Sequence, residues 1–219
     1  MRSNLSLRVI FGFAALGFLI IAVILPSWGL NAAVILLSVL SAVEIFYAFG
    51  KQNVLYSIIL SVIIFALFSC ISFIRIEENG NFLIWAAFIG AFVTDTFAYI
   101  FGIFFGRHKL CEKISPKKTW EGAIGGGICT IIAFWIFGMI LENNFLLKVN
   151  FVNLMILGVL CAIFSQLGDL TASFIKRRQN IKDFGNILPG HGGILDRCDS
   201  LLFTAPLVFI FVNLFRVIT

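Results

Sequence analysis

Residues 54–74 read VLYSIILSVIIFALFSCISFI, a run of 21 residues in which no side chain is charged. A helix needs roughly 20 mostly apolar residues to cross the hydrocarbon core of a membrane. A helix also satisfies its own backbone hydrogen bonds, which the hydrocarbon cannot do. The run therefore predicts a transmembrane helix.

Six more uncharged or nearly uncharged runs lie on either side of it. They occupy residues 7–26, 30–49, 82–105, 122–141, 151–175 and 199–218. The whole chain is 60% hydrophobic and 12% charged, whereas a soluble domain has about 45–50% apolar and about 25% charged residues. This composition excludes a soluble globule, and the 26 Phe residues exclude a disordered chain. We predict an all-α, polytopic membrane protein with about seven transmembrane helices.

The predicted helices leave no room for a separate soluble domain, because they use about 140 of the 219 positions. We therefore treat residues 1–219 as a single transmembrane domain. Residues 1–80 contribute N-terminal helices without an assigned role, and residues 82–218 form the half expected to carry the functional site. The seven glycines between residues 90 and 127 are interpreted as close-packing sites between helices. The five cysteines form no C-x-x-C pair, so neither a disulfide framework nor a zinc site is expected.

Basic residues are distributed unequally between the two sides of the predicted helices. With the N-terminus in the cytoplasm, the outer segments hold only three of the 16 Lys and Arg residues, namely Arg75, Lys148 and Arg216. Cytoplasmic loops of membrane proteins are enriched in Lys and Arg. We therefore predict a cytoplasmic N-terminus, an uncleaved first helix, and two basic cytosolic loops at 106–121 and 176–198. The net charge of +5 is interpreted as orientation and contact with anionic lipid, not as nucleic-acid binding.

The position of Asp169, a carboxylate inside a predicted helix, needs a reason. Asp169 belongs to the run 151–175, and a carboxylate at the bilayer centre costs about 2.5–3.5 kcal/mol on insertion scales. We therefore expect it to face protein or water and to have a partner. Helical spacing places these residues on one polar face that descends towards the cytosol: Gln166, Asp169, Ser173, Lys176 and Arg177. The alternative, a helix end whose basic side chains reach for the interface, is our interpretation of Arg178.

The loop that follows is rich in glycine and ends in two carboxylates. Glycines around Pro189 and His191 allow backbone N–H groups to approach a ligand closely, although they also mark an ordinary turn. Asp196 and Asp199 are three residues apart, on one face of the first turn of the last predicted helix, a spacing suited to a hard cation. Capping of that helix is the alternative interpretation of either carboxylate.

These groups indicate phosphoryl or nucleotidyl transfer when they are combined with Lys117 and Lys118 of the other basic loop. Carboxylates bind Mg²⁺, and Lys and Arg bind phosphate oxygens. A phosphate nucleophile is already anionic near neutral pH. We therefore expect His191 to bind substrate or to order the loop rather than to act as a base.

The run from Ser173 to Asp199 closely resembles the signature of the phosphatidate cytidylyltransferase (CDP-diacylglycerol synthase) family. It reads SFIKRRQNIKDFGNILPGHGGILDRCD. Three upstream segments look like other motifs of this family: DTFAYIFG at 95–102, GRHKL at 106–110 and SPKKTWEG at 115–122, with VEIF at 43–46 as a looser match. The resemblance covers about residues 90–200 well and the first 80 only by hydropathy. The chain is shorter than many members, which carry extra N-terminal helices.

The resemblance implies an enzyme that transfers CMP from CTP to phosphatidic acid, giving CDP-diacylglycerol and pyrophosphate. It implies Mg²⁺ as cofactor and leaves a second cation open. Asp169 and Asp196 would hold the metal with Asp199 close by, and Lys176 would take part in catalysis. The substrate-binding residues that it implies are Lys117, Lys118, Ser173, Arg177, Lys182, His191 and Arg197.

The same resemblance implies a multi-pass protein of the bacterial inner membrane, in contact with membrane lipids, with its active site on the cytoplasmic side. Both a monomer and a homodimer are compatible with the sequence. A related CTP-dependent membrane enzyme, such as a polyprenol kinase or an ether-lipid cytidylyltransferase, is an alternative. An ion or metal transporter would also explain Asp95 and Asp169 within helices. Transport favours charges spread through both leaflets, whereas these cluster at the cytosolic ends.

Overall fold

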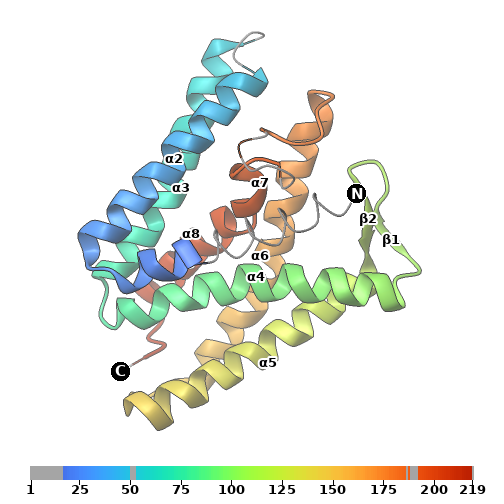
Figure 1. Cartoon of the computed structure of the whole chain (residues 1–219). Coiled ribbons are helices and arrows are strands. Elements are labelled where there is room, and N and C mark those ends of the chain that lie inside the picture. Colours follow the sequence, from blue (N-terminus) through green and yellow to red (C-terminus); the bar gives the residue numbers. More distant parts are fainter. Residues whose placement is uncertain (1–16, 50–52, 186, 188–191, 219) are drawn as a thin grey trace. The chain divides into compact units, whose positions relative to one another are not determined.

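Five long apolar helices dominate the computed structural model, which describes residues 17–49, 53–185, 187 and 192–218 (Figure 1). They are α2 (Ser27–Phe49), α3 (Val54–Ile76), α4 (Gly80–Phe105), α5 (Trp120–Phe145) and α6 (Phe151–Arg178). Each has 23 to 28 residues and is long and apolar enough to cross a membrane. The prediction of a mainly helical, polytopic membrane protein is confirmed at this level.

The structure departs from the predicted helices at the two ends of the chain. Residues 17–24 are helical, and the rest of the first predicted helix lies outside the described residues. In place of one helix over 199–218, the structure has the short α7 (Leu195–Cys198) and the 14-residue α8 (Leu201–Leu214). Helix α8 stops early because the chain beyond it pairs with the segment before α6. Val149 bridges Ile218, and the N–H of Asn150 donates to the carbonyl of Val217 at 2.9 Å.

A small antiparallel hairpin, which the sequence analysis did not predict, occupies the expected loop 106–121. It consists of β1 (Lys109–Cys111) and β2 (Ser115–Thr119), and it joins α4 to α5. Glu121 fixes its base, because its carboxylate accepts the N–H groups of Arg107 and His108 at 3.1 and 3.2 Å. The hydroxyl of Thr119 then caps α5 by accepting the N–H of Gly122 at 3.1 Å. Contacts at the end of α4 and the start of α5 therefore stabilise a strand pair in a sequence with little strand propensity of its own.

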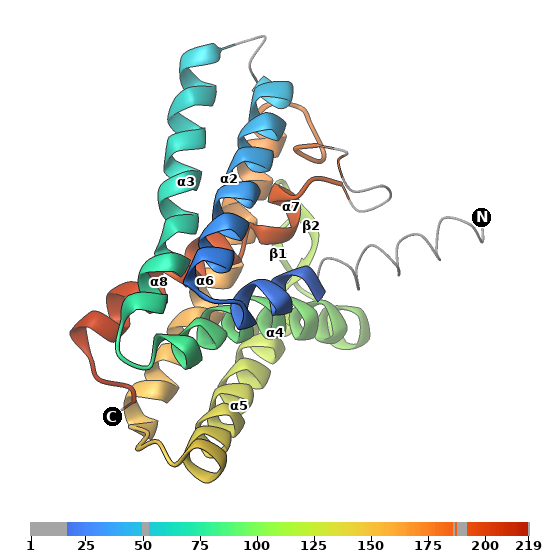
Figure 2. The same cartoon turned by 60° about the vertical axis from the view of Figure 1, so that its left-hand side comes forward.

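The chain divides into two compact units. Unit 1 contains Met1–Ser72 and Ile175–Cys198, and unit 2 contains Phe73–Phe174 and Asp199–Thr219, so that α6 contributes to both. In unit 1, α2 and α3 run side by side (Figures 1 and 2). The buried ring of Phe49 packs edge-on against Tyr56 and against Phe184 of the loop after α6, with ring centres 5.7 and 6.0 Å apart.

Glycines bring the helices of unit 2 together. A Cβ atom at Gly126 would lie 2.7 Å from the carbonyl oxygen of Thr94, and one at Gly90 would lie 2.7 Å from the Cβ atom of Cys161. Small residues permit such close approach of helices within a membrane. The close-packing interpretation is confirmed there, whereas a Cβ atom at Gly127 would find its nearest neighbour at an ordinary 3.9 Å. Helix α4 consequently packs along α5, and it also contacts α8.

Candidate active site

A cavity of about 470 Å³ opens in unit 2 between the hairpin, α4, α5 and α6. Its polar lining comes from α4, the hairpin and α6: Asp95, Tyr99, Lys109, Ser115, Lys117, Lys118, Thr119, Gln166 and Asp169. The fold therefore gathers three lysines and two carboxylates around one space. Such a set can bind both the phosphate oxygens and the cation of a nucleotide.

Asp169 has the partner that its position within an apolar helix requires. The ammonium of Lys118 lies 2.6 Å from Asp169 Oδ2, and the hydroxyl of Ser173, one turn further along α6, donates to Oδ1 at 3.3 Å. The side chains of Lys118 and Asp169 are 21% and 30% exposed, so a ligand in the cavity can reach both. Gln166, on the same face of α6, instead donates to the carbonyl of Ala123 and holds α5.

Asp95 is a further carboxylate of this cavity, and it was not among the predicted site residues. Its Oδ2 accepts the hydroxyl of Ser200 at 2.6 Å, and its Oδ1 accepts the hydroxyl of Ser165 at 3.2 Å. The available signal was its position inside an apolar run, which is as unusual as that of Asp169. The structure brings the two carboxylates into the lining of one cavity, although 74 residues of chain separate them.

In unit 1, Asp196 is the centre of a second polar network. Its Oδ1 lies 2.7 Å from the ammonium of Lys176, and the two side chains are only 4% and 10% exposed. Its Oδ2 accepts the N–H groups of Phe184 and Gly193, both at 3.0 Å. The Lys176 ammonium also lies 5.3 Å from the ring centre of Phe184. Asp196 therefore joins residues 184 and 193 to Lys176 near the end of α6.

These contacts bear on the two interpretations of Asp196. An N-cap accepts N–H groups from residues that follow it, whereas the donors here all precede Asp196 in the chain. Each carboxylate oxygen has two acceptor positions. Among the described residues, Oδ2 accepts two N–H groups and Oδ1 accepts the Lys176 ammonium.

The remaining predicted residues take varied positions. Lys117 is exposed and lines the cavity of unit 2. Arg177 donates to the carbonyl of Ile181 at 3.3 Å, which orders the turn after α6, and Lys182 and Arg197 are exposed. Asp199 is 8% exposed and accepts the N–H of Ser200. His191 lies outside the described residues.

The oxygen donors of unit 2 fit a magnesium ion. Mg²⁺ prefers hard oxygen ligands and keeps several waters, so one or two carboxylates together with substrate phosphates make a usual site. Asp95 and Asp169 supply such carboxylates. Within the described part of the chain, no group of three or more His, Cys, Asp or Glu side chains is arranged to hold a metal. Of the predicted ligands, Asp169 and Asp199 belong to unit 2 and Asp196 belongs to unit 1.

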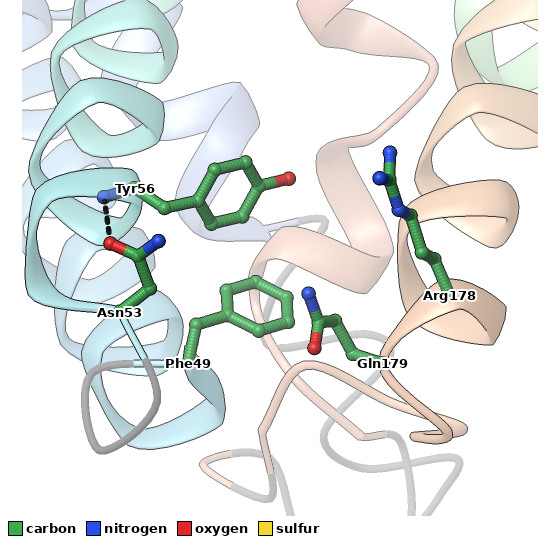
Figure 3. A pocket seen from close by; sticks show the side chains of 5 residues that line it. All are labelled: Phe49, Asn53, Tyr56, Arg178 and Gln179. Carbon is green, nitrogen blue, oxygen red and sulfur yellow. Dashed lines mark hydrogen bonds between the residues drawn. The ribbon is translucent and has the colours of Figure 1, made fainter.

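A smaller pocket of about 240 Å³ lies in unit 1 between the start of α3 and the end of α6. Figure 3 shows the hydroxyl of Tyr56 pointing across it towards Arg178, with the Phe49 ring and the amide of Gln179 beside them. The side-chain oxygen of Asn53 is engaged by the N–H of Tyr56 at 3.1 Å. The groups that face this pocket are thus mainly hydrogen-bond donors beside an aromatic wall, and Arg178 contributes to a pocket as well as to a helix end.

Comparison with known proteins agrees with this chemistry. The model of the cytidylyltransferase family matches residues 47–215. A protein named phosphatidate cytidylyltransferase from Rickettsia bellii is 37% identical over 97% of this chain and 92% of its own length. Proteins with the same name from Rickettsia prowazekii and Bacillus subtilis are 35% and 39% identical, over 98% and 64% of this chain and 94% and 51% of their own lengths. This chain belongs to the cytidylyltransferase family.

Proposed function

We propose that this protein transfers CMP from CTP to phosphatidic acid, giving CDP-diacylglycerol and pyrophosphate. The observation that carries the proposal is the cavity of unit 2, in which Lys117 and Lys118 face Asp95 and Asp169. Family membership and the names of the relatives specify the nucleotide and the lipid. The long apolar helices are suited to a membrane, which is where a phosphatidic acid substrate resides.

Different residues bind the two anionic substrates, CTP and phosphatidic acid, and stabilise their reaction. A phosphate oxygen of phosphatidic acid attacks the α-phosphorus of CTP, the new P–O bond forms, and the bond to pyrophosphate breaks. Lys117 and Lys118 bind the nucleotide phosphates and neutralise charge on the departing pyrophosphate. Asp169 orients the Lys118 ammonium through their 2.6 Å ion pair. Ser173, Arg177, Lys182, His191 and Arg197 complete substrate binding, and Lys176 holds Asp196 in place for catalysis.

We propose Mg²⁺ as the cofactor, held by carboxylates among Asp169, Asp196 and Asp199, with Asp95 as an additional ligand in the cavity of unit 2. When bound, Mg²⁺ shields the approach of one anion to the other and the charge that develops on the leaving group. The hard oxygen donors of these side chains support this choice of metal. A second cation is left open.

We further propose seven membrane spans, a cytoplasmic N-terminus and an active site on the cytoplasmic side of the bacterial inner membrane. The unequal distribution of Lys and Arg supports this orientation. The two basic loops would then both face the cytosol, where CTP is found. A homodimer is compatible with this arrangement.

The test uses purified protein in phosphatidic acid vesicles with MgCl₂ and CTP that carries ³²P on either the α- or the γ-phosphorus. We expect label in the chloroform-soluble product from α-labelled CTP and none from γ-labelled CTP. Label from γ-labelled CTP would identify a lipid kinase. Transfer to an ether-linked lipid in preference to phosphatidic acid would identify the related cytidylyltransferase. Absence of any lipid label with folded protein would overturn the proposal.

A further inference from the structure

Glu44 is the most unusual buried group in unit 1. It lies in the apolar helix α2, its residue is only 1% exposed, and it is absent from the predicted catalytic set. A carboxylate in such a position is costly unless its oxygens receive hydrogen bonds. Glu44 therefore has to be explained by what it contacts.

Its contacts lie 150 residues away, in the loop that leads to Asp196. Oε1 accepts the N–H of Ile194 at 2.8 Å, and Oε2 accepts the N–H of Leu195 at 3.0 Å. Leu195 directly precedes Asp196 in the chain. Both oxygens of one carboxylate are thus used on the two backbone groups just before the aspartate that binds Lys176.

Two glycines of the signature run enclose the same carboxylate. A Cβ atom at Gly193 would lie 2.6 Å from Glu44 Oε2, and one at Gly185 would lie 2.8 Å from Glu44 Oε1. Such distances leave no room for a side chain at either position. Gly192 is different, because its φ of +87° is a backbone conformation that favours glycine. A Cβ atom there would meet Asp183 and Asp196 at an ordinary distance of 3.4 Å.

We propose that Glu44 is a positioning residue: it holds residues 194 and 195 on α2, and thereby sets the position of Asp196 against Lys176. Asp196 ties residue 184 to residue 193 through two N–H bonds, and Glu44 ties residues 194 and 195 to the helix. The three residues directly before Asp196 are consequently all fixed through their backbone N–H groups. This gives the N-terminal helices a role in the reaction, and its catalytic part rests on the proposed function.

The first experiment separates positioning from general stability with two buried thiols. Cys198 follows Asp196 in α7 and is 4% exposed, whereas Cys161 lies in unit 2 and is 0% exposed. In Glu44→Gln one oxygen is replaced by an NH₂ group that faces a backbone N–H, so one strong hydrogen bond is lost. We expect the rate at which N-ethylmaleimide labels Cys198 in detergent-solubilised protein to rise about tenfold or more, with Cys161 unchanged.

The matched control is Ser41→Ala, on the same helix. Ser41 is 0% exposed, and its hydroxyl has no hydrogen-bond partner among the described residues. This variant should leave the labelling rates and the activity as in the wild type. For Glu44→Gln we expect kcat to fall about 10- to 100-fold, because a displacement near 1 Å has this effect in active sites. The KM for CTP should change less than kcat, since Lys117 and Lys118 belong to the other unit.

A double-mutant cycle tests the contact itself. Gly193→Ala should increase Cys198 labelling in the wild type and should add nothing in a Glu44→Ala background, where the obstructing carboxylate is gone. Gly192→Ala should increase labelling equally in both backgrounds, because its strain comes from the positive φ.

Unchanged Cys198 labelling in Glu44→Gln would overturn the proposal. Equal increases at Cys198 and Cys161 would overturn it as well, because Glu44 would then stabilise the whole fold. If the wild type makes no CDP-lipid, the proposed function fails, while the labelling comparison still decides whether Glu44 holds the loop.

Discussion

Among single residues, two carboxylates matter most, because each binds a lysine and also accepts other hydrogen bonds. Asp169 pairs with Lys118, and Asp196 pairs with Lys176, at 2.6 and 2.7 Å. The first pair is partly exposed to its cavity, and the second is nearly buried. Substitution of either aspartate by asparagine removes the charged partner of a lysine.

Asp196→Asn should reduce turnover by at least about tenfold while the protein stays folded, because an amide oxygen is a poor substitute for a charged ligand of Mg²⁺ and of Lys176. Asp169→Asn should behave alike, and the double variant should be little worse than either single one, since residues that act as a unit are not additive. The measurement is Mg²⁺-dependent CDP-lipid formation. Asp183→Asn, at an exposed position, is the control, and near wild-type activity of Asp196→Asn at all Mg²⁺ concentrations would refute the metal assignment.

Lys117→Gln/Lys118→Gln should raise the KM for CTP by about tenfold or more, because each lysine gives a charged hydrogen bond to phosphate. Lys113→Gln is the matched control, since Lys113 is an exposed lysine of the same hairpin outside the cavity lining. Steady-state kinetics with CTP as the varied substrate provide the comparison. Unchanged kinetics with less protein in the membrane fraction would instead indicate that the two lysines anchor the loop to lipid.

At the scale of elements, the packing of α4 on α5 positions the hairpin over the helix carboxylates. Gly126→Ala should lower the thermal unfolding midpoint, because the added methyl would meet the Thr94 carbonyl at 2.7 Å and overpacking costs about 1–3 kcal/mol. Gly127→Ala, one residue further, should be neutral or slightly stabilising, since its methyl has space and alanine favours a helix. Equal midpoints for the two variants in detergent would contradict the close-packing interpretation.

Length and hydropathy predicted the long helices well, and contacts distant in sequence explain what they missed. The uncharged runs located α2 to α6 because length and hydropathy are local properties of the chain. The hairpin depends on Glu121 and Thr119, whose bonds form only when α4 and α5 are already in place. The early end of α8 depends in the same way on the bridge to Val149.

The candidate site shows the same division. Helical spacing placed Asp169 with Ser173, and the hydrogen bond between them confirms it. Other contacts join segments that no local pattern connects. They are the ion pair of Asp169 with Lys118, the position of Asp95 in the same cavity, and the hydrogen bonds of Glu44 to residues 194 and 195. The position of a carboxylate within an apolar run is the signal in the sequence that could have identified Asp95 and Glu44 as residues with a functional or structural role.

At the scale of the whole molecule, the proposed orientation puts both basic loops on the cytoplasmic side. Cys111, in β1, and an introduced Lys182→Cys, at an exposed position after α6, should both resist a membrane-impermeant maleimide in intact cells and react after permeabilisation. Cys198 is too buried for this purpose. Labelling of either position from outside would contradict the positive-inside assignment.

The most direct test of the central claim is the identity of both products. Purified protein is incubated in phosphatidic acid vesicles with CTP and Mg²⁺, and the lipid and aqueous phases are analysed by mass spectrometry. We expect CDP-diacylglycerol and pyrophosphate in equal amounts. CDP together with a newly phosphorylated lipid, or no conversion by folded protein, would contradict it.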